Sequence, residues 1–437
     1  MNSNHWQCLI TQIEQCNPQL AKLCSHWQSR EMNQYSNGIW QSNSTSPSIN
    51  RDYLAELITQ QQKRLGLFNS PAIQRALNNN VVLSAHHTAS LCHPIALQTL
   101  ILACLGDATP KDIVVLCTDW IPMDNLFYPR GFLIKDVHGN TQAVNLFAKS
   151  CKKQLVADMP GFAKDNIEKV QQQAEKLRLN HTLTQQQLNQ LSSALERYYL
   201  TEPVINLPKY KDQCALVNHT ICQALFPEHN IIFVNISDIA CSLLIEQLRN
   251  DNSVISQLLT KPETSELFIN ALEGEPGCWS RASQQGSILF WCVNNGKMVS
   301  FNRYNNGVLA NDFTQLPLQA DALIRELQAG TIIPGMAITF IVLMFGQGLV
   351  CAGGMRQIAY THAIKQAFIN ATGAQQFRHH PVDRMVAGLS VGGDGVDPSA
   401  PCLFQELANA PIALENLRHI PFRHVIQVSS ENLLALS

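Results

Sequence analysis

The chain has 437 residues, of which 46% are hydrophobic and 15% charged, and its formal net charge at pH 7 is −2. These proportions are typical of a globular protein with a large core, and they exclude an intrinsically disordered chain. A near-neutral charge without any Lys/Arg-rich block indicates that the protein does not bind nucleic acid through a basic surface.

The fourteen cysteines are scattered singly along the chain, and no two of them form a C-x-x-C pair. This pattern predicts free, buried thiols rather than a zinc or redox centre, and free thiols are stable in a reducing compartment. The first residues, MNSNHWQCLI, lack the basic and apolar regions of a secretory signal. We therefore expect a cytoplasmic protein whose own side chains hold no metal.

The first half of the chain changes from a polar helical pattern to a sheet pattern. Residues 1–74 contain many Gln, Asn and Ser and are expected to form an N-terminal helical or irregular segment. Residues 75–150 then show an apolar strand at 81–84, a helix at 94–105 that begins with a proline, and a second strand at 112–121. This βαβ pattern predicts an α/β protein with a parallel sheet.

Two insertions are expected to interrupt this core. Residues 151–222 are polar and rich in helix-forming residues, which predicts a helical insertion. The sheet pattern returns in 223–260, where a buried strand at 231–234 precedes a turn and an amphipathic helix. In 261–330, apolar and polar residues alternate around Asn295-Gly296, which predicts a β-hairpin in a small β-containing insertion.

Residues 331–437 are expected to complete the core. Their uncharged stretch 332–354 is long enough to span a membrane. It nevertheless contains Pro334 and Gln347 and lacks basic or aromatic flanks. We expect a buried helix followed by a buried strand, with a turn at 346–348 and no membrane contact.

Two adjacent histidines, His86 and His87, stand where the first predicted strand ends. In open α/β sheets, ligands bind at the carboxyl ends of the strands. Imidazole exchanges protons near neutral pH, and imidazolium stabilises phosphate oxygens. The pair is therefore a candidate for catalysis, and two ordinary loop histidines are the alternative.

Polar residues also follow the second and third strands, and the carboxyl ends of adjacent parallel strands share one edge of the sheet. These residues are Asp119, Trp120, Asp124 and Asn125 after the second strand, and Asn235, Ser237 and Asp238 after the third. An acid at this edge can orient a histidine, bind a substrate amine or hold Mg²⁺. The alternative is capping of the following turn or helix, which is the favoured interpretation of Asn125.

Gly353 and Gly354 follow the last predicted strand. Paired glycines at a strand-to-helix turn let the backbone approach a ligand closely, and N–H groups beyond them can bind an anion. The spacing matches neither G-x-G-x-x-G nor a Walker A loop, so a nucleotide motif is absent from the sequence.

Four stretches follow one another in a familiar order. They are VVLSAHHTASLCHPIALQTLILA continuing into VVLCTDWIPMDN, then NIIFVNISDIACSLLIEQL, then WSRASQQGSILFWCVNNGK, and then IIPGMAITFIVLMFGQGLVCAGGMRQIAYTHAIKQAF. This order, over about residues 75–375, resembles the cysteine ligase family of bacillithiol biosynthesis. The first loop of that family is Gly-Gln-Gln where this chain has Ala85-His86-His87, and its C-terminal coiled coil has no heptad counterpart in 376–437.

The resemblance implies a Rossmann-like core with two insertions, a cytoplasmic location and an ADP-type nucleotide. It also implies a reaction that joins cysteine to an amino-sugar conjugate through an amide. The positions of this chain to which the resemblance points as site residues are His86, His87, Trp120, Asp124, Ser237, Asp238, Gly353, Gly354 and Tyr360. The coiled-coil dimer of the family is not expected here.

We therefore expect a ligase-like enzyme that forms a C–N (amide) bond on a small-molecule substrate, with His86, His87 and Asp124 as catalytic residues. The residues expected to bind substrate or nucleotide are Trp120, Asn125, Asn235, Ser237, Asp238, Gly353, Gly354 and Tyr360. ATP or ADP with Mg²⁺ is the candidate cofactor. A catalytically inactive binding or scaffold relative, and a nucleotidyl- or phosphoryl-type transferase, are the alternatives, and the oligomeric state is left open.

Overall fold

A computed structural model describes residues 3–41, 51–91, 94–123, 130–386 and 411–423. Its centre is a sheet of four parallel strands in the order β12-β1-β2-β5. These strands are β1 (Val81–His87), β2 (Asp112–Thr118), β5 (Asn230–Asn235) and β12 (Val350–Ala352). Their nearly continuous apolar runs reflect burial of both sheet faces.

The chain fills the sheet from β1 to β2 to β5 and then returns to place β12 on the other side of β1. This is the strand order around the switch point of a Rossmann fold. The predicted α/β class with a Rossmann-like parallel core is therefore confirmed.

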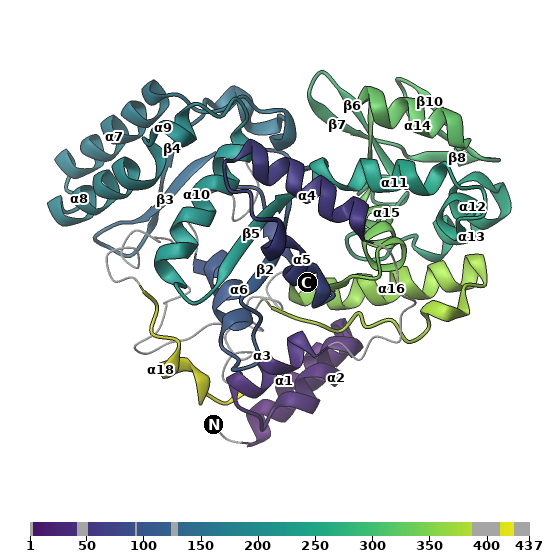
Figure 1. The fold of residues 1–437 in the computed structure, drawn as a ribbon, viewed down its shortest axis with the longest axis horizontal. Coiled ribbons are helices and arrows are strands. Elements are labelled where there is room, and N and C mark those ends of the chain that lie inside the picture. Colours follow the sequence, from purple (N-terminus) through teal and green to yellow (C-terminus); the bar gives the residue numbers. More distant parts are fainter. Residues whose placement is uncertain (1–2, 42–50, 92–93, 124–129, 387–410, 424–437) are drawn as a thin grey trace.

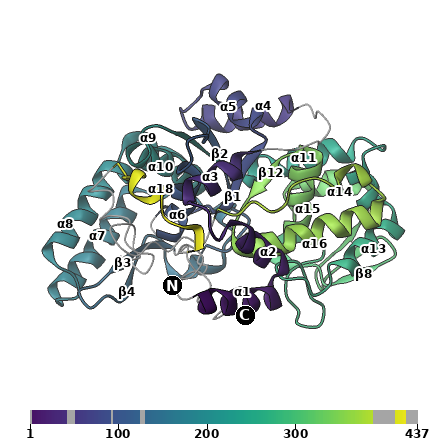
Figure 2. The ribbon, with the colours of Figure 1, turned by 90° about the horizontal axis from the view of Figure 1, so that it is seen from below.

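Helices cover both faces of the sheet (Figures 1 and 2). Leu83 and Phe233 face one side and Val82 and Val234 the other, because successive strand residues point to opposite faces. The helices of the first side include α1 (Ser3–Cys16), α2 (Pro18–Trp27), α3 (Met32–Trp40), α6 (Pro94–Cys104) and α10 (Tyr210–Leu225). Those of the second include α4 (Asp52–Arg64), α5 (Ser70–Asn78), α11 (Ala240–Leu248) and α16 (Met355–Thr372).

The helical insertion lies between β2 and β5, at the left of Figure 1. It begins with a hairpin that the sequence analysis did not predict. Its elements are β3 (Gly131–Lys135), β4 (Thr141–Asn145), η1 (Lys149–Lys153), η2 (Val156–Asp158), α7 (Lys164–Leu179), α8 (Gln185–Ala194), η3 (Leu195–Tyr199) and α9 (Glu202–Ile205).

The second insertion lies between β5 and β12, on the opposite side of the sheet in Figures 1 and 2. Asn295 and Gly296 both have positive φ, 50° and 68°, and form the predicted turn of the β6–β7 hairpin. The elements here are α12 (Val254–Thr260), α13 (Pro262–Ala271), β6 (Phe290–Asn294), β7 (Lys297–Ser300), β8 (Arg303–Asn305), β9 (Val308–Ala310), β10 (Gln315–Pro317) and α14 (Ala320–Ala329).

The uncharged stretch 332–354 is buried inside the molecule. It forms β11 (Ile332–Pro334), α15 (Met336–Ile341) and η5 (Val342–Gly346), then turns at Gly348, whose φ is 63°, and enters β12. The predicted helix and strand are confirmed, with β11 as an addition. Among the helices that the structure describes, none combines the length and the apolar character of a membrane span.

The remaining described elements lie toward the C-terminus. They are η6 (Gln375–Phe377) and α18 (Glu415–Arg418). Residues 411–423 run beside α3, on the side of the molecule where the N-terminal helices lie (Figure 1).

Candidate active site at the carboxyl edge of the sheet

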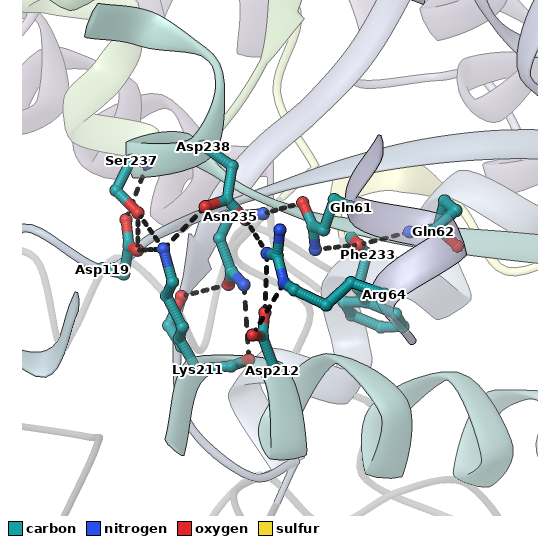
Figure 3. A network of polar contacts seen from close by, with 11 residues as sticks. Gln61, Gln62, Arg64, Asp119, Lys211, Asp212, Phe233, Asn235, Ser237 and Asp238 are labelled. Carbon is teal, nitrogen blue, oxygen red and sulfur yellow. Dashed lines mark hydrogen bonds and ion pairs between the residues drawn. The ribbon is translucent and has the colours of Figure 1, made fainter. Parts of the chain in front are cut away.

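The strand-end residues Asp119 and Ser237 meet at the carboxyl edge of the sheet (Figure 3). Asp119 follows β2, and Ser237 lies in η4 (Ile236–Asp238), directly after β5. The Ser237 backbone N–H donates to Asp119 Oδ1 at 3.0 Å, and the Ser237 hydroxyl donates to Asp119 Oδ2. Two strands that are separate in sequence therefore share one hydrogen-bonded pair.

Lys211 of α10 completes this contact from the helical side. Its Nζ lies 2.7 Å from Ser237 Oγ, 2.7 Å from Asp238 Oδ1 and 3.7 Å from Asp119 Oδ2. The ammonium donates to the serine oxygen while the serine hydroxyl donates to Asp119. Ser237 Oγ thus lies between a cation and a carboxylate.

Arg64, at the end of α4, ties these elements together. Its guanidinium forms two 2.9 Å bonds to the Asp212 carboxylate and a 2.6 Å bond to Asp238 Oδ2. Bidentate pairing fixes geometry more strictly than a single bond does. We call Arg64, Asp119, Lys211, Asp212, Asn235, Ser237 and Asp238 the edge cluster.

Asn235 links the edge cluster to the neighbouring elements. Its N–H donates to Gln61 Oε1 at 3.0 Å, and its Nδ2 donates to the Lys211 carbonyl at 3.3 Å. Thr88, just after β1, donates through its hydroxyl to Asn235 Oδ1 at 3.1 Å. The ends of β1, β2 and β5 are therefore joined by side chains as well as by the sheet.

Burial raises the pKa of one carboxyl group in the edge cluster. Asp119 is fully buried, and desolvation raises its pKa to about 6, although Lys211 and the hydrogen bonds from Ser237 act in the opposite direction. Burial tends to lower the pKa of Lys211, but the nearby Asp119 and Asp238 carboxylates outweigh it and raise that pKa. Asp119 thus titrates near neutral pH beside an ammonium that stays charged, which is suited to acid–base catalysis.

The two candidate histidines are the last residues of β1, not loop residues, because the strand extends to His87 after a shift in register. His86 is 1% exposed, its Nε2 lies 2.6 Å from Thr99 Oγ1 of α6, and its ring packs edge-on against Phe233. Burial, assisted by His87, lowers the pKa of His86 to about 3. His86 is therefore a neutral imidazole in the core, whereas His87 is only half-buried and pairs in register with Thr118.

The other predicted residues fall into two groups. Asn235, Ser237 and Asp238 belong to the edge cluster, and Trp120 packs in the apolar core beside it. Gly353 and Gly354 follow β12, the outer strand opposite β5, and are about 14 Å from the end of β5 at the usual strand spacing, whereas Tyr360 lies in α16. Asp124 and Asn125 lie outside the described residues.

Contacts within the chain hold Gly353 in the turn after β12. The Gly353 N–H donates to the Arg384 carbonyl at 3.0 Å, and the Val386 N–H donates to the Gly353 carbonyl at 2.8 Å. A Cβ at position 353 would overlap the Gln357 amide, which itself bonds the Cys351 carbonyl. Close packing within the chain therefore explains the glycine.

Four members of the edge cluster were absent from the predicted site residues: Arg64, Asp119, Lys211 and Asp212. Of these, Asp119 carries a sequence signal, because an acid directly after a buried strand stands at the ligand edge of the sheet. Arg64, Lys211 and Asp212 lie on helices whose local sequence gives no sign of a site.

Comparison with known proteins adds no assignment. No protein-family model matches the chain. No curated protein matches it either. Within the described ranges, no group of three or more His, Cys, Asp or Glu side chains is placed to hold a metal ion.

Proposed function

We propose that this protein is a ligase-like enzyme that forms a C–N (amide) bond, joining cysteine or another amino acid to an amino sugar or a similar small amine. The reaction class is supported by the resemblance of four ordered sequence stretches to the cysteine ligase family. The choice of catalytic residues is supported by the edge cluster, which lies at the ligand-binding edge of a Rossmann-like sheet.

The observation that carries the proposal is the position of Ser237 Oγ between Lys211 and Asp119. ATP first converts the carboxylate of the amino acid into a mixed phosphoric anhydride. The attacking amine then bonds to the acyl carbon through its lone pair and loses a proton, while the phosphate group departs with the electrons of the acyl carbon–oxygen bond. The Ser237 oxygen accepts that proton while its own proton passes to Asp119. A carboxyl group with a pKa of about 6 suits this relay near neutral pH.

Lys211 supplies the charge that this step requires. Negative charge develops on the acyl oxygen during attack, and a fixed ammonium in a buried site stabilises it strongly. Arg64 and Asp238 act as positioning residues, because they hold Lys211 and η4 in place. ATP enters this proposal as an added co-substrate that activates the carboxylate.

The experiment is an assay of the full-length protein with cysteine, D-glucosamine, ATP and Mg²⁺, in which mass spectrometry detects the condensed product. We expect Ser237→Ala and Asp119→Asn to lower kcat by about 10²- to 10⁴-fold. Ser283→Ala and Asp251→Asn, at exposed positions outside the edge cluster, are the matched controls and should keep full activity.

Circular dichroism checks that each variant is folded. Absence of product across a panel of amino acids and amino sugars, or full activity in Ser237→Ala, refutes the proposal. Calorimetric binding of these substrates without turnover would instead identify a binding protein that has lost catalysis.

A further inference from the structure

A cavity lies at the outer edge of β5, away from the edge cluster. Its volume is about 230 Å³, and it is enclosed by the α4–α5 connection, α10 and β5. It is lined by the polar residues Gln62, Asn69, His219, Gln223 and Asn230 and by the apolar residues Leu67, Phe68, Ile73 and Ile232. No Lys, Arg, Asp or Glu is among its lining residues.

Three of the five polar side chains are anchored through their donor groups. His219 Nδ1 lies 2.9 Å from the Ile231 carbonyl, Gln62 Nε2 donates to the Phe233 carbonyl at 3.2 Å, and Asn230 Nδ2 donates to Asp112 Oδ1 at 2.8 Å. Carbonyl oxygens accept only, so His219 carries its proton on Nδ1 and the Gln62 amide is oriented with its nitrogen inward. The Asp112 carboxylate orients Asn230 in the same way.

Each of these three side chains therefore keeps one hydrogen-bond acceptor that is not used within the chain. His219 Nε2, Gln62 Oε1 and Asn230 Oδ1 have no hydrogen-bond partner among the described residues, and none of the three is sealed from solvent. Burial lowers the pKa of His219, although its bond to Ile231 opposes this, so Nε2 remains an acceptor at neutral pH. The cavity lining is therefore uncharged, and it combines these three acceptors with the amides of Asn69 and Gln223 and with apolar side chains.

We propose that this cavity binds a monosaccharide-sized, uncharged polyol. Hydroxyl groups of such a ring donate to several acceptors at once, and its C–H face packs against an aromatic ring. Phe68 lines the cavity and is 50% exposed, and its ring also carries the Lys63 ammonium, 4.9 Å from the ring centroid. A cationic ligand would lack a carboxylate partner among the lining residues.

The site is separate from the proposed catalytic residues. Figure 3 shows Gln62 beyond Phe233, on the side away from Lys211 and Asp119. The neighbouring Gln61 points to Asn235 of the edge cluster. Ligand binding at the cavity can therefore be measured without an activity assay. The Ser237→Ala variant should bind the ligand as the wild-type protein does.

The test is ligand-observed NMR and calorimetry on the full chain with glucose, N-acetylglucosamine and myo-inositol, with adenosine as the comparator. We expect at least one polyol to bind with a Kd on the order of 1 mM. Phe68→Ala should weaken that binding about fivefold. Gln223→Trp, at an exposed lining position, should block the cavity and abolish binding.

Phe313→Ala is the matched control, because Phe313 is 69% exposed and does not line the cavity, and it should leave binding unchanged. His219→Phe removes one acceptor and should also weaken binding once its fold is verified. Failure of every polyol to bind, or binding that is equal in the wild-type protein, Phe68→Ala and Gln223→Trp, overturns the proposal. Binding of adenosine without any polyol overturns the assignment of the ligand class.

Discussion

At the scale of single residues, Asp119 is the group whose protonation matters most. Its carboxyl group is fully buried, and its pKa is about 6 in the folded protein against an ordinary value of 3.8. Lys211 and Ser237 stabilise the charged form without fully offsetting desolvation. Keeping this acid where it titrates near neutral pH therefore costs folding stability.

The pH dependence of unfolding tests this cost. Between about pH 4 and pH 6 the folded state holds the Asp119 proton and the unfolded state has lost it, so stability falls as pH rises through this window. The total is about 3 kcal/mol. Urea unfolding should show that Asp119→Asn gains stability relative to wild type between about pH 4 and pH 7.5. A difference between the two proteins that does not change with pH would contradict a raised pKa.

At the scale of elements, the connection after β1 is fixed by α10. Asn218 of α10 accepts from the Leu91 N–H at 2.9 Å and donates to the Ala89 carbonyl at 2.8 Å, and it is 3% exposed. Ser90 is hydrogen-bonded to Tyr199 of η3. Helix α10 and η3 of the helical insertion therefore together determine the shape of the loop at the carboxyl end of β1, where ligands bind in related sheets.

Removing the Asn218 side chain leaves one buried donor and one buried acceptor without partners. We expect Asn218→Ala to lower the free energy of unfolding by about 3 kcal/mol, measured by urea denaturation. Asn252→Ala, at an exposed position, should change it by less than about 0.5 kcal/mol. Equal stability of the two variants would show that the loop holds its conformation without α10.

At the scale of the whole molecule, the N-terminal helices and residues 411–423 belong to one core with the sheet. Met32 N–H donates to the Ile420 carbonyl at 2.9 Å, and Phe422 N–H donates to the Arg30 carbonyl at 2.8 Å. The Phe422 ring is fully buried, with its centroid 4.4 Å from that of Tyr35. Segments almost 400 positions apart in the sequence thus close over the same core.

Phe422→Ala should open a cavity in this contact. We expect a loss of about 3–5 kcal/mol in the free energy of unfolding, seen as a lower urea midpoint. Phe313→Ala, at an exposed ring, should leave the midpoint almost unchanged. A midpoint for Phe422→Ala equal to that of the control would mean that residues 411–423 contribute little to the core.

Features that depend on neighbouring residues could be predicted from the sequence. The apolar runs at β1, β2 and β5 predicted the parallel sheet, Asn295-Gly296 predicted a hairpin, and the stretch 332–354 was recognised as buried. The end of β1 was placed too early, because polar residues such as His86 and His87 give no strand signal although they pair with β2 after a shift in register. The proposed roles of His86 and His87 depend on the facing direction of each ring, which alternates along a strand and is decided by packing.

The sequence by itself therefore determined the strands of the parallel core, and it placed Asn235, Ser237 and Asp238 at a strand end. Only the tertiary structure decided that Lys211, Asp212 and Arg64 surround them, because these residues come from helices that precede and follow the sheet strands in the chain. Arg64 and Lys211 keep their charges because each is paired with a carboxylate, which offsets the desolvation that burial imposes. The periodicity of apolar residues can be seen in a short stretch of sequence, whereas contacts between charged residues that are distant in sequence arise only from packing.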